Sequence, residues 1–223
     1  MEKKLFAEAI MQYYRQLQAP TNLPVDVEVM NPYLNDATVA IAEKFYQKYY
    51  SDNHPRVMLF GINPGRFGAG LTGVPFNDPA RLEEVCGIPN DFDKKPELSS
   101  RFINEMVIAY GGPEKFYAKY FISGVSPLGY LREGINLNYY DIKGFKPMFE
   151  DYVVAQIKEQ LKFGIDQSVA YSIGKGQNIK YLNYINDKYR FFEKMLPLPH
   201  PRWVMQYRLK RKDEFIQEYL DVL

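Results

Sequence analysis

The chain has 223 residues, of which 46% are hydrophobic and 25% charged, which is ordinary for one globular domain with a buried core. Its net charge of +1 neither indicates nor excludes a nucleic-acid partner. One cysteine, Cys86, excludes an intramolecular disulfide, and together with only two histidines it argues against a metal centre built from one chain.

The N-terminal segment has apolar residues at helical spacing, which predicts an amphipathic helix over residues 3–17. Charged and polar residues interrupt this pattern, so it does not resemble a signal peptide, and no later segment is long enough to span a bilayer. We therefore expect a cytoplasmic protein without a membrane partner. A second helix is expected over 37–50, with Asp36 as its N-cap.

Short apolar runs bounded by turn residues then alternate with helical patterns, which is typical of an α/β fold. Strands are expected at 56–62, 120–125, 168–174 and 191–196. Helices are expected near 99–110, 146–162 and 176–187, and a last helix from about Met205. The alternation predicts a three-layer α/β/α fold with a central four-stranded parallel sheet. No repeat or linker divides the chain, so residues 1–223 are expected to form a single domain.

Ligands of such sheets bind outside the carboxyl ends of the strands. Four loops leave these ends, at 61–78, 126–140, 174–177 and 197–206. We expect the active site to be assembled from these loops.

The loop that follows the first strand, Gly61 to Phe76, holds five glycines and two prolines. Glycine permits close backbone approach to a ligand, and proline stiffens the chain. The spacing matches neither a P-loop nor a dinucleotide-binding fingerprint. A ligand-binding loop is favoured over a long structural turn, because long loops in compact domains are usually functional.

The loop after the last strand contains a histidine with three prolines close to it in sequence. His200 lies among Pro197, Pro199 and Pro201. Alone, it could equally be a surface histidine in a proline-rich turn. Asn63 lies at the end of another parallel strand, and the two residues form a candidate catalytic pair.

These segments resemble the single-strand-selective monofunctional uracil-DNA glycosylases, a family of the uracil-DNA glycosylase superfamily. The first loop is similar to that family's G-M-N-P-G-P-F-G…T-G-V-P-F, and residues 196–203 are similar to its H-P-S-P-R-N with two residues missing. Residues 126–137 resemble C-P-L…G-x-N-L, residues 97–102 an S-x-x-R-F stretch, and residues 30–33 a short N-P stretch. Arg66 stands where the family has proline, which together with the shortened histidine loop indicates a divergent bacterial branch.

The resemblance implies a DNA glycosylase that flips uracil or a 5-substituted uracil out of DNA and hydrolyses its N-glycosidic bond, the first step of base excision repair. Asn63 would position the attacking water, since asparagine cannot take a proton at neutral pH. His200 would donate a hydrogen bond to the 2-oxo oxygen of the departing base. No lysine stands at the matched positions to form a Schiff base, so the enzyme is expected to be monofunctional. We expect a monomer that needs neither a cofactor nor a metal.

In the substrate pocket, Phe76 would stack on the flipped pyrimidine and Asn136 would read its polar edge. Asn138 is the alternative residue for recognising the polar edge of the base. Phe76 could instead belong to the core, and Asn136 could instead cap the turn before Tyr139. The full set of expected substrate-binding residues is Gly61, Ile62, Pro64, Gly65, Phe67, Phe76 and Asn136.

DNA would lie along a basic rim with apolar side chains that wedge into the base stack. A solvated helix face is the ordinary alternative for the basic run near residue 210. The expected DNA-binding residues are Arg66, Arg202, Trp203, Met205, Arg208 and Lys210.

Two other classes of protein compete with this interpretation. One is a catalytically inactive nucleic-acid or nucleotide-binding module of the same fold, against which Asn63 and His200 argue. The other is a phosphate-binding transferase, which would need metal ligands near the first loop, where Asp78 stands alone. The preferred damaged base and the choice between single and double strands stay open.

Overall fold

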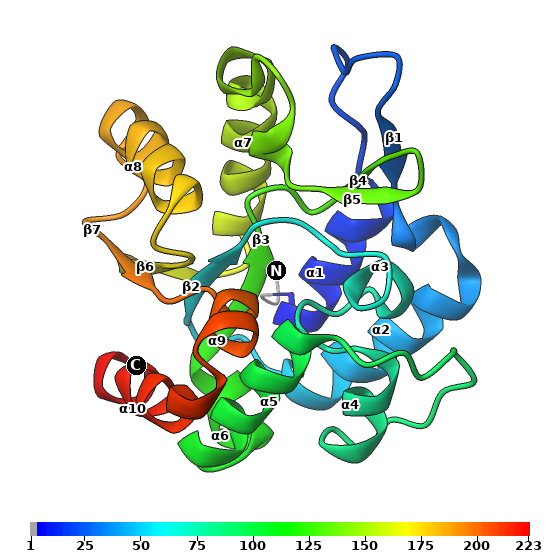
Figure 1. The fold of residues 1–223 in the computed structure, drawn as a ribbon, viewed down its shortest axis with the longest axis vertical. Helices are drawn as coiled ribbons and strands as arrows, with labels where there is room; N and C mark the ends of the chain where they lie inside the picture. The colour runs from blue at the N-terminus through cyan, green and yellow to red at the C-terminus, as the bar shows by residue number, and fades with distance from the viewer. Residues whose placement is uncertain (1–3) are drawn as a thin grey trace.

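The computed structural model describes residues 4–223, which fold around a four-stranded parallel sheet (Figure 1). Its strands are β2 (Arg56–Gly61), β3 (Tyr120–Gly124), β6 (Ile165–Ile173) and β7 (Lys194–Leu198), in the order β3-β2-β6-β7. The central strand β2 pairs in parallel with both β3 and β6. Its residues 58–61 are all buried, as expected of a strand that is covered on both faces.

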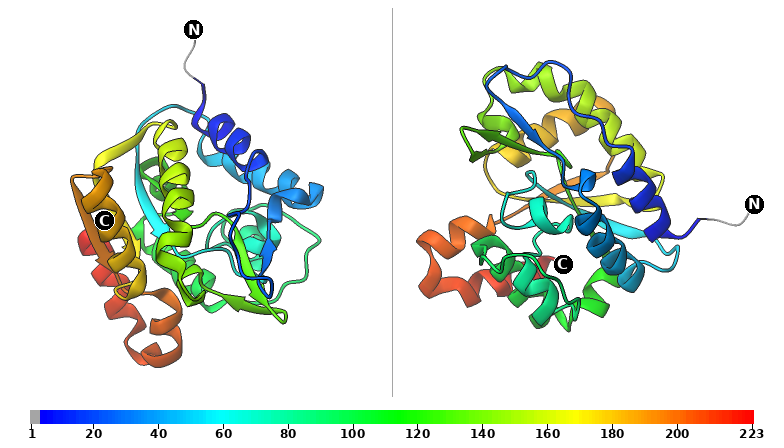
Figure 2. Two further views of the ribbon diagram at one scale, coloured as in Figure 1. Left: turned by 90° about the horizontal axis from the view of Figure 1, so that it is seen from above. Right: turned by 90° about the vertical axis from the view of Figure 1, so that its right-hand side faces the viewer.

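Helices cover both faces of this sheet (Figures 1 and 2), which confirms the predicted three-layer α/β/α architecture. On one side lie α7 (Phe145–Leu161) and α8 (Gln177–Tyr189); on the other lie α5 (Leu98–Tyr110), α6 (Pro113–Lys119), α9 (Pro201–Tyr207) and α10 (Lys212–Val222). Helices α1 (Phe6–Arg15) and α2 (Asp36–Tyr49) pack on each other, and the Phe6 ring lies 5.5 Å from that of Phe121 on β3.

A second, antiparallel sheet was not predicted. It consists of β1 (Glu28–Met30), β4 (Gly129–Arg132) and β5 (Ile135–Leu137), in the order β1-β4-β5. The hairpin between β4 and β5 turns at Glu133 and Gly134, which both have positive φ, as a two-residue turn between twisted strands requires. This small sheet fixes the course of the 126–140 loop over the end of the main sheet.

Several predicted boundaries differ from the observed ones. Asp36 is not the N-cap of α2: the Asn35 side chain accepts the hydrogen bond from Thr38 N, so Asp36 is the first helical residue. The last strand begins at Lys194 rather than 191, because the buried rings of Phe191 and Phe192 precede it. Residue 3, where the first helix was expected to begin, lies outside the described residues. Short elements complete the chain: η1 (Pro32–Leu34), α3 (Ala69–Thr72), α4 (Pro79–Glu84), η2 (Tyr139–Asp141) and η3 (Leu209–Arg211), the last of which interrupts the predicted C-terminal helix.

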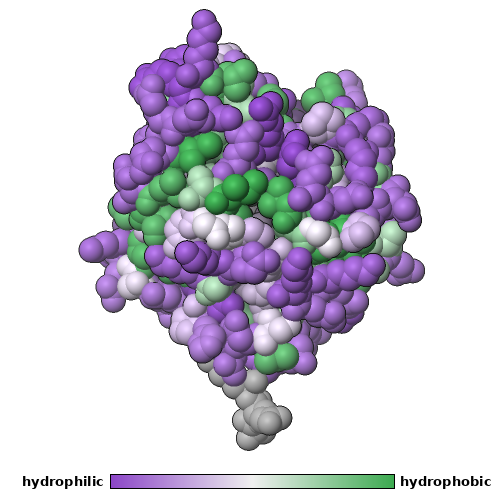
Figure 3. Space-filling view, turned by 90° about the horizontal axis from the view of Figure 1, so that it is seen from below, coloured by the Kyte–Doolittle hydropathy of each residue, from purple (hydrophilic) through white to green (hydrophobic). Residues whose placement is uncertain are grey.

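The side chain of Arg56 is wholly buried in the core. The Arg56 guanidinium makes two hydrogen bonds of 2.9 Å to the Asp52 carboxylate and one of 2.8 Å to Tyr117 O. This satisfies the buried charge, as its desolvation requires. The surface seen in Figure 3 is mostly hydrophilic, with a band of hydrophobic side chains across it. Within residues 4–223, none of the helices is both long and apolar enough to cross a membrane.

Candidate active site

The loops after β2 and β3 are held side by side at the carboxyl edge of the sheet. The parallel pairing continues beyond the strands, where Val125 N donates to Gly61 O (3.0 Å) and Ser126 N donates to Ile62 O (3.1 Å). Gly129 is needed at the next contact, since a β-carbon there would lie 2.8 Å from Pro64 O. The backbone of the first loop is therefore fixed against the 126–140 loop.

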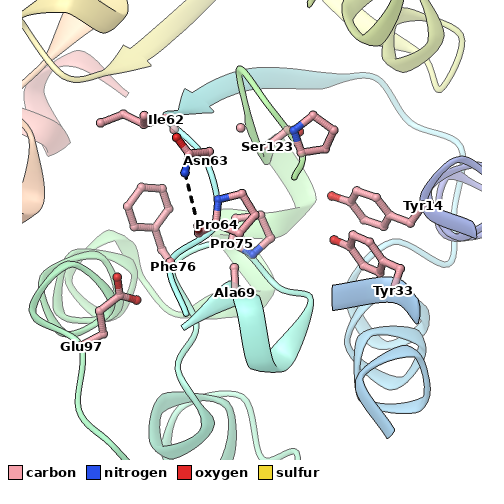
Figure 4. A pocket seen from close by; sticks show the side chains of 14 residues that line it. Tyr14, Tyr33, Ile62, Asn63, Pro64, Ala69, Pro75, Phe76, Glu97 and Ser123 are labelled. Carbon is pink, nitrogen blue, oxygen red and sulfur yellow. Dashed lines mark hydrogen bonds between the residues drawn. The ribbon is translucent and has the colours of Figure 1, made fainter. Parts of the chain in front are cut away.

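A pocket opens at this edge, with an empty volume of about 510 Å³ when the open solvent at its mouth is included. Figure 4 shows Phe76 and Glu97 on one side of the prolines of the first loop, and the Tyr14 and Tyr33 rings on the other. Six of the predicted site residues line this pocket together: Gly61, Ile62, Asn63, Pro64, Gly65 and Phe76.

Phe76 is held in an unusual backbone conformation, with φ of 55°. A left-handed backbone conformation is uncommon for a bulky residue, and it persists only where surrounding contacts hold the residue in place. Here Asn104 of α5 donates to Phe76 O at 3.0 Å, and the ring packs on Gly61, where a β-carbon would lie 3.0 Å from Phe76 Cε2. The aromatic face is thus presented to the pocket next to Asn63 (Figure 4).

The Asn63 side chain joins the first loop to the loop that follows β5. Its Oδ1 accepts from Tyr139 N at 2.9 Å, and its Nδ2 donates to Leu137 O at 3.0 Å and to Pro64 O at 3.3 Å. These bonds fix which end of the amide is oxygen and which is nitrogen. Both amide hydrogens are used, but Oδ1 keeps a second lone pair that a water molecule can donate to.

The two candidate readers of the base occupy different surroundings. Asn136 lies over the first loop, where its Oδ1 accepts from Arg66 N at 3.2 Å. Asn138 caps η2, and its Nδ2 donates to the Asp141 carboxylate at 2.8 Å. The turn-capping role considered for Asn136 therefore belongs to Asn138. Asn136 lies at the rim of the pocket and not among its lining residues.

His200 is the N-cap of α9. Its Nδ1 accepts from Arg202 N at 3.2 Å, so Nε2 is the nitrogen that carries the proton in the neutral ring. Burial, and then the nearby Arg202 charge, lower the pKa of His200 from 6.5 to about 4. The imidazole is consequently neutral at pH 7 and offers one fixed N–H donor.

His200 lines a second pocket, of about 880 Å³, rather than the one that contains Asn63. Ile62 borders both pockets. Asn63 and His200 therefore face two adjoining pockets at the same edge of the sheet, with Ile62 between them. Within the described chain, 4–223, no cluster of three or more potential metal ligands is found.

The predicted DNA-binding residues fall into two groups. Trp203 is 41% exposed and packs edge-on against Phe215, with the Arg208 guanidinium 5.0 Å from its ring centre. Arg202 and Lys210 are also exposed. Met205, by contrast, is only 4% exposed and belongs to the core, so its predicted contact with DNA is wrong for this conformation.

Arg66 and Phe67 form part of the rim of the first loop. The Arg66 guanidinium lies 4.5 Å from the Phe67 ring centre and donates to Gly134 O. Phe67 is partly exposed and does not line the pocket, unlike the other substrate-binding residues expected in its loop.

Sequence reasoning assigned no role to Glu97, which lines the pocket beside Asn63 and Phe76. Burial, followed by the nearby Asp78 carboxylate, raises the pKa of Glu97 from 4.5 to about 7, although Arg202 acts in the opposite direction. Perturbed acids of this kind are concentrated at functional sites. The resemblance of residues 97–102 to the family marks this segment but assigns no role to Glu97, whose neighbours in the fold come from distant segments.

Comparisons with known proteins agree with this geometry. The chain is 39% identical to SMUG2 of Pedobacter heparinus, whose crystal structure superposes with a TM-score of 0.95 and covers 98% of this chain and 96% of that one. Curated relatives include the single-strand selective monofunctional uracil-DNA glycosylases of Rattus norvegicus (29% identity over 115 residues, 44% of this chain and 41% of that protein) and Bos taurus (28% over 100 residues, 37% of each). These matches span about two fifths of the length of the curated relatives.

The family model of the uracil DNA glycosylase superfamily matches residues 47–223. That range includes every loop of the site, from Asn63 to His200, and the predicted resemblance is thereby confirmed. With most of the chain matched, this protein belongs to the uracil DNA glycosylase superfamily.

Proposed function

We propose that this protein is a monofunctional DNA glycosylase that flips uracil, or a 5-substituted uracil, out of DNA and hydrolyses its N-glycosidic bond. The observation that carries the proposal is the pair of fixed hydrogen-bonding groups at one sheet edge: the oriented Asn63 amide and the neutral, N–H-bearing His200 imidazole. The names of the relatives support the same activity.

In this mechanism Asn63 holds the nucleophilic water. Its Oδ1 already accepts from Tyr139 N, and the second lone pair accepts a hydrogen bond from the water. Asparagine removes no proton, so the bond to the base must be largely broken before water attacks the anomeric carbon. The rate then depends on how well the site stabilises the departing base.

His200 supplies that stabilisation. As negative charge develops on the base, Nε2–H of the neutral ring donates to its 2-oxo oxygen. One preorganised donor in a water-poor site contributes about 3 kcal/mol to the barrier reduction. The bond from Arg202 N to Nδ1 keeps the proton on Nε2 and so keeps the ring ready to donate.

The remaining predicted residues bind the extruded nucleotide and DNA. Phe76 stacks on the base, and Asn136 reads its edge after moving from the pocket rim. Exposed side chains on the C-terminal side contact DNA: Arg202, Trp203, Arg208 and Lys210. Arg66 and Phe67 do so from the first loop.

Among residues 4–223, no lysine lines the pocket of Asn63, and Lys175, which borders the His200 pocket, is paired with Glu218. A Schiff-base step needs an amine beside the reacting carbon, so the lack of a lysine among the described residues that line the Asn63 pocket supports a monofunctional enzyme. We also propose that the chain acts as a single domain and a monomer in a bacterial cytoplasm, where it would start base excision repair.

The test is base release from labelled oligonucleotides that contain uracil or 5-hydroxymethyluracil, single-stranded or mispaired, without added metal and followed by alkali cleavage. Wild-type protein is expected to yield cleaved strands, whereas Asn63→Ala and His200→Ala are not. Folded wild-type protein that binds these oligonucleotides but releases no base would contradict the proposal and favour an inactive binding module.

A further inference from the structure

Glu97 occupies the N-cap position of α5 but does not cap the helix. Its backbone is extended there, with φ of −113° and ψ of 127°, and its side chain accepts no hydrogen bond from the first turn. Its backbone N–H donates to Asp78 Oδ2 at 3.0 Å, which anchors the residue next to the first loop. The carboxyl group is therefore free to point elsewhere, and Figure 4 shows it beside Phe76.

The carboxyl group lies against two glycines of the first loop. Glu97 Oε2 occupies the place that a β-carbon on Gly68 would take, and Oε1 lies 3.4 Å from the corresponding position on Gly65. The Asn136 amide nitrogen lies 3.5 Å from that same position on Gly65. A carboxyl group and an amide thus lie together against Gly65, at the wall of the pocket that contains Asn63.

Within residues 4–223, no side chain or backbone group donates a hydrogen bond to the Glu97 carboxyl group. Two charged groups act on it: the Asp78 carboxylate, at the start of α4, repels its charged form, and the Arg202 guanidinium, on α9, attracts it without a direct hydrogen bond. Two other cations lie near the first loop, Arg66 and Lys95, and both are placed over the Phe67 ring. The Glu97 carboxyl group is only partly buried and lines the pocket, so a ligand bound there can form a hydrogen bond with it.

We propose that Glu97 is a base-recognition residue of this pocket, and that its carboxylic acid form donates a hydrogen bond to a ring carbonyl oxygen of the flipped base. The inference rests on the proposed glycosylase function and adds a specificity-determining residue to it. The chemistry requires the neutral form, because the departing base gains negative charge that a donor stabilises and a carboxylate repels.

The neutral form is available at physiological pH. Burial and the Asp78 charge place the pKa of Glu97 at about 7, and the phosphates of bound DNA act in the same direction as Asp78. His200 does not titrate in this range, since its pKa is lowered to about 4. A loss of excision above pH 7 that disappears in Glu97→Gln would therefore identify Glu97 as the titrating group.

The experiment measures single-turnover excision of uracil from single-stranded DNA between pH 6 and pH 8.5. The wild-type rate constant is expected to fall roughly 30-fold over this range, as the acid with a pKa near 7 ionises. Glu97→Gln, which keeps an N–H donor and cannot ionise, is expected to show a flat profile and to exceed the wild type at pH 8.5. Glu193→Gln, at an exposed glutamate away from the pocket, should retain the wild-type profile.

Three results are distinguishable. A wild-type profile that Glu97→Gln leaves unchanged would overturn the role of Glu97 while leaving the glycosylase proposal intact. A wild-type rate that rises with pH, and loses that rise in Glu97→Gln, would also overturn it, since the carboxylate would then be the active form. Folded wild-type protein without base release at any pH would overturn the proposed function itself.

Discussion

The two loops that supply the candidate catalytic residues are built in different ways. The first loop is tied to its neighbours by polar contacts: Asn63 to residues 137 and 139, Arg66 N to Asn136, and Phe76 O to Asn104. The histidine loop is held by its prolines, by the bond from Tyr219 to Pro199 O, and by one bond from Arg202 N to the imidazole. Chemistry and structural support are therefore combined in Asn63 but nearly separate in His200.

The largest effect is expected at Asn63, where one substitution should reduce both the excision rate and the stability of the fold. Asn63→Ala removes the water-binding amide and leaves Leu137 O and Tyr139 N without their partner. Excision should fall by at least about 100-fold, and each unsatisfied buried group costs about 1–3 kcal/mol of the free energy of unfolding. Chemical denaturation and single-turnover kinetics on the same preparations test this, and an inactive variant of wild-type stability would contradict the double role.

At His200 the same loss of activity should come with little loss of stability. His200→Ala is expected to lower the excision rate about 10²–10³-fold, because one donor to the developing negative charge is removed. Only the N-cap bond to Arg202 N is lost from the fold, at a cost of about 1 kcal/mol. His200→Asn serves as the control: asparagine is a good N-cap and should restore the free energy of unfolding without restoring full activity.

A smaller effect is expected at Phe76, where the contact with the base can be removed while the backbone constraint is kept. Phe76→Ala retains the left-handed backbone and the bond from Asn104 but lacks the aromatic face. Loss of one base–aromatic stacking contact corresponds to about 1–3 kcal/mol, so excision should fall roughly tenfold or more. Phe76→Tyr, which keeps the aromatic face, should stay close to wild type in the same assay, and equal losses in both variants would indicate a packing role instead.

The smallest effect is expected from removing one positive charge among the exposed residues proposed to contact DNA after His200. Arg208→Gln removes an exposed cation next to Trp203 without touching either pocket. Affinity for undamaged DNA should weaken modestly. The slope of log affinity against log salt concentration should become less steep by about the amount that one phosphate contact contributes. Titration of labelled DNA at several salt concentrations measures this slope, and an unchanged slope would remove Arg208 from the DNA interface.

The sequence was sufficient to predict the main sheet and the two loops, because buried parallel strands are continuous apolar runs that end in turn residues. The strands β1, β4 and β5 were missed because three or four residues are too short to show a periodicity. Met205 was assigned to DNA because its loop was read as exposed, whereas α9 turns it into the core beside Val204.

The bonds that orient the site could not be predicted in the same way. Asn63 meets Leu137 and Tyr139 across more than seventy residues of intervening chain, and local patterns carry no information on such pairs. Glu97 was missed for the same reason, since its environment comes from Asp78, from Arg202 and from two glycines of the first loop.

The chain contains one tryptophan, Trp203, and it lies at the edge of the His200 pocket, partly exposed and next to Arg208. All indole fluorescence of this protein therefore originates at the rim where DNA is proposed to dock. The emission wavelength and its quenching provide a label-free optical reporter of that one location. Docking of DNA can thus be followed in a stopped-flow mixture without a label on either molecule.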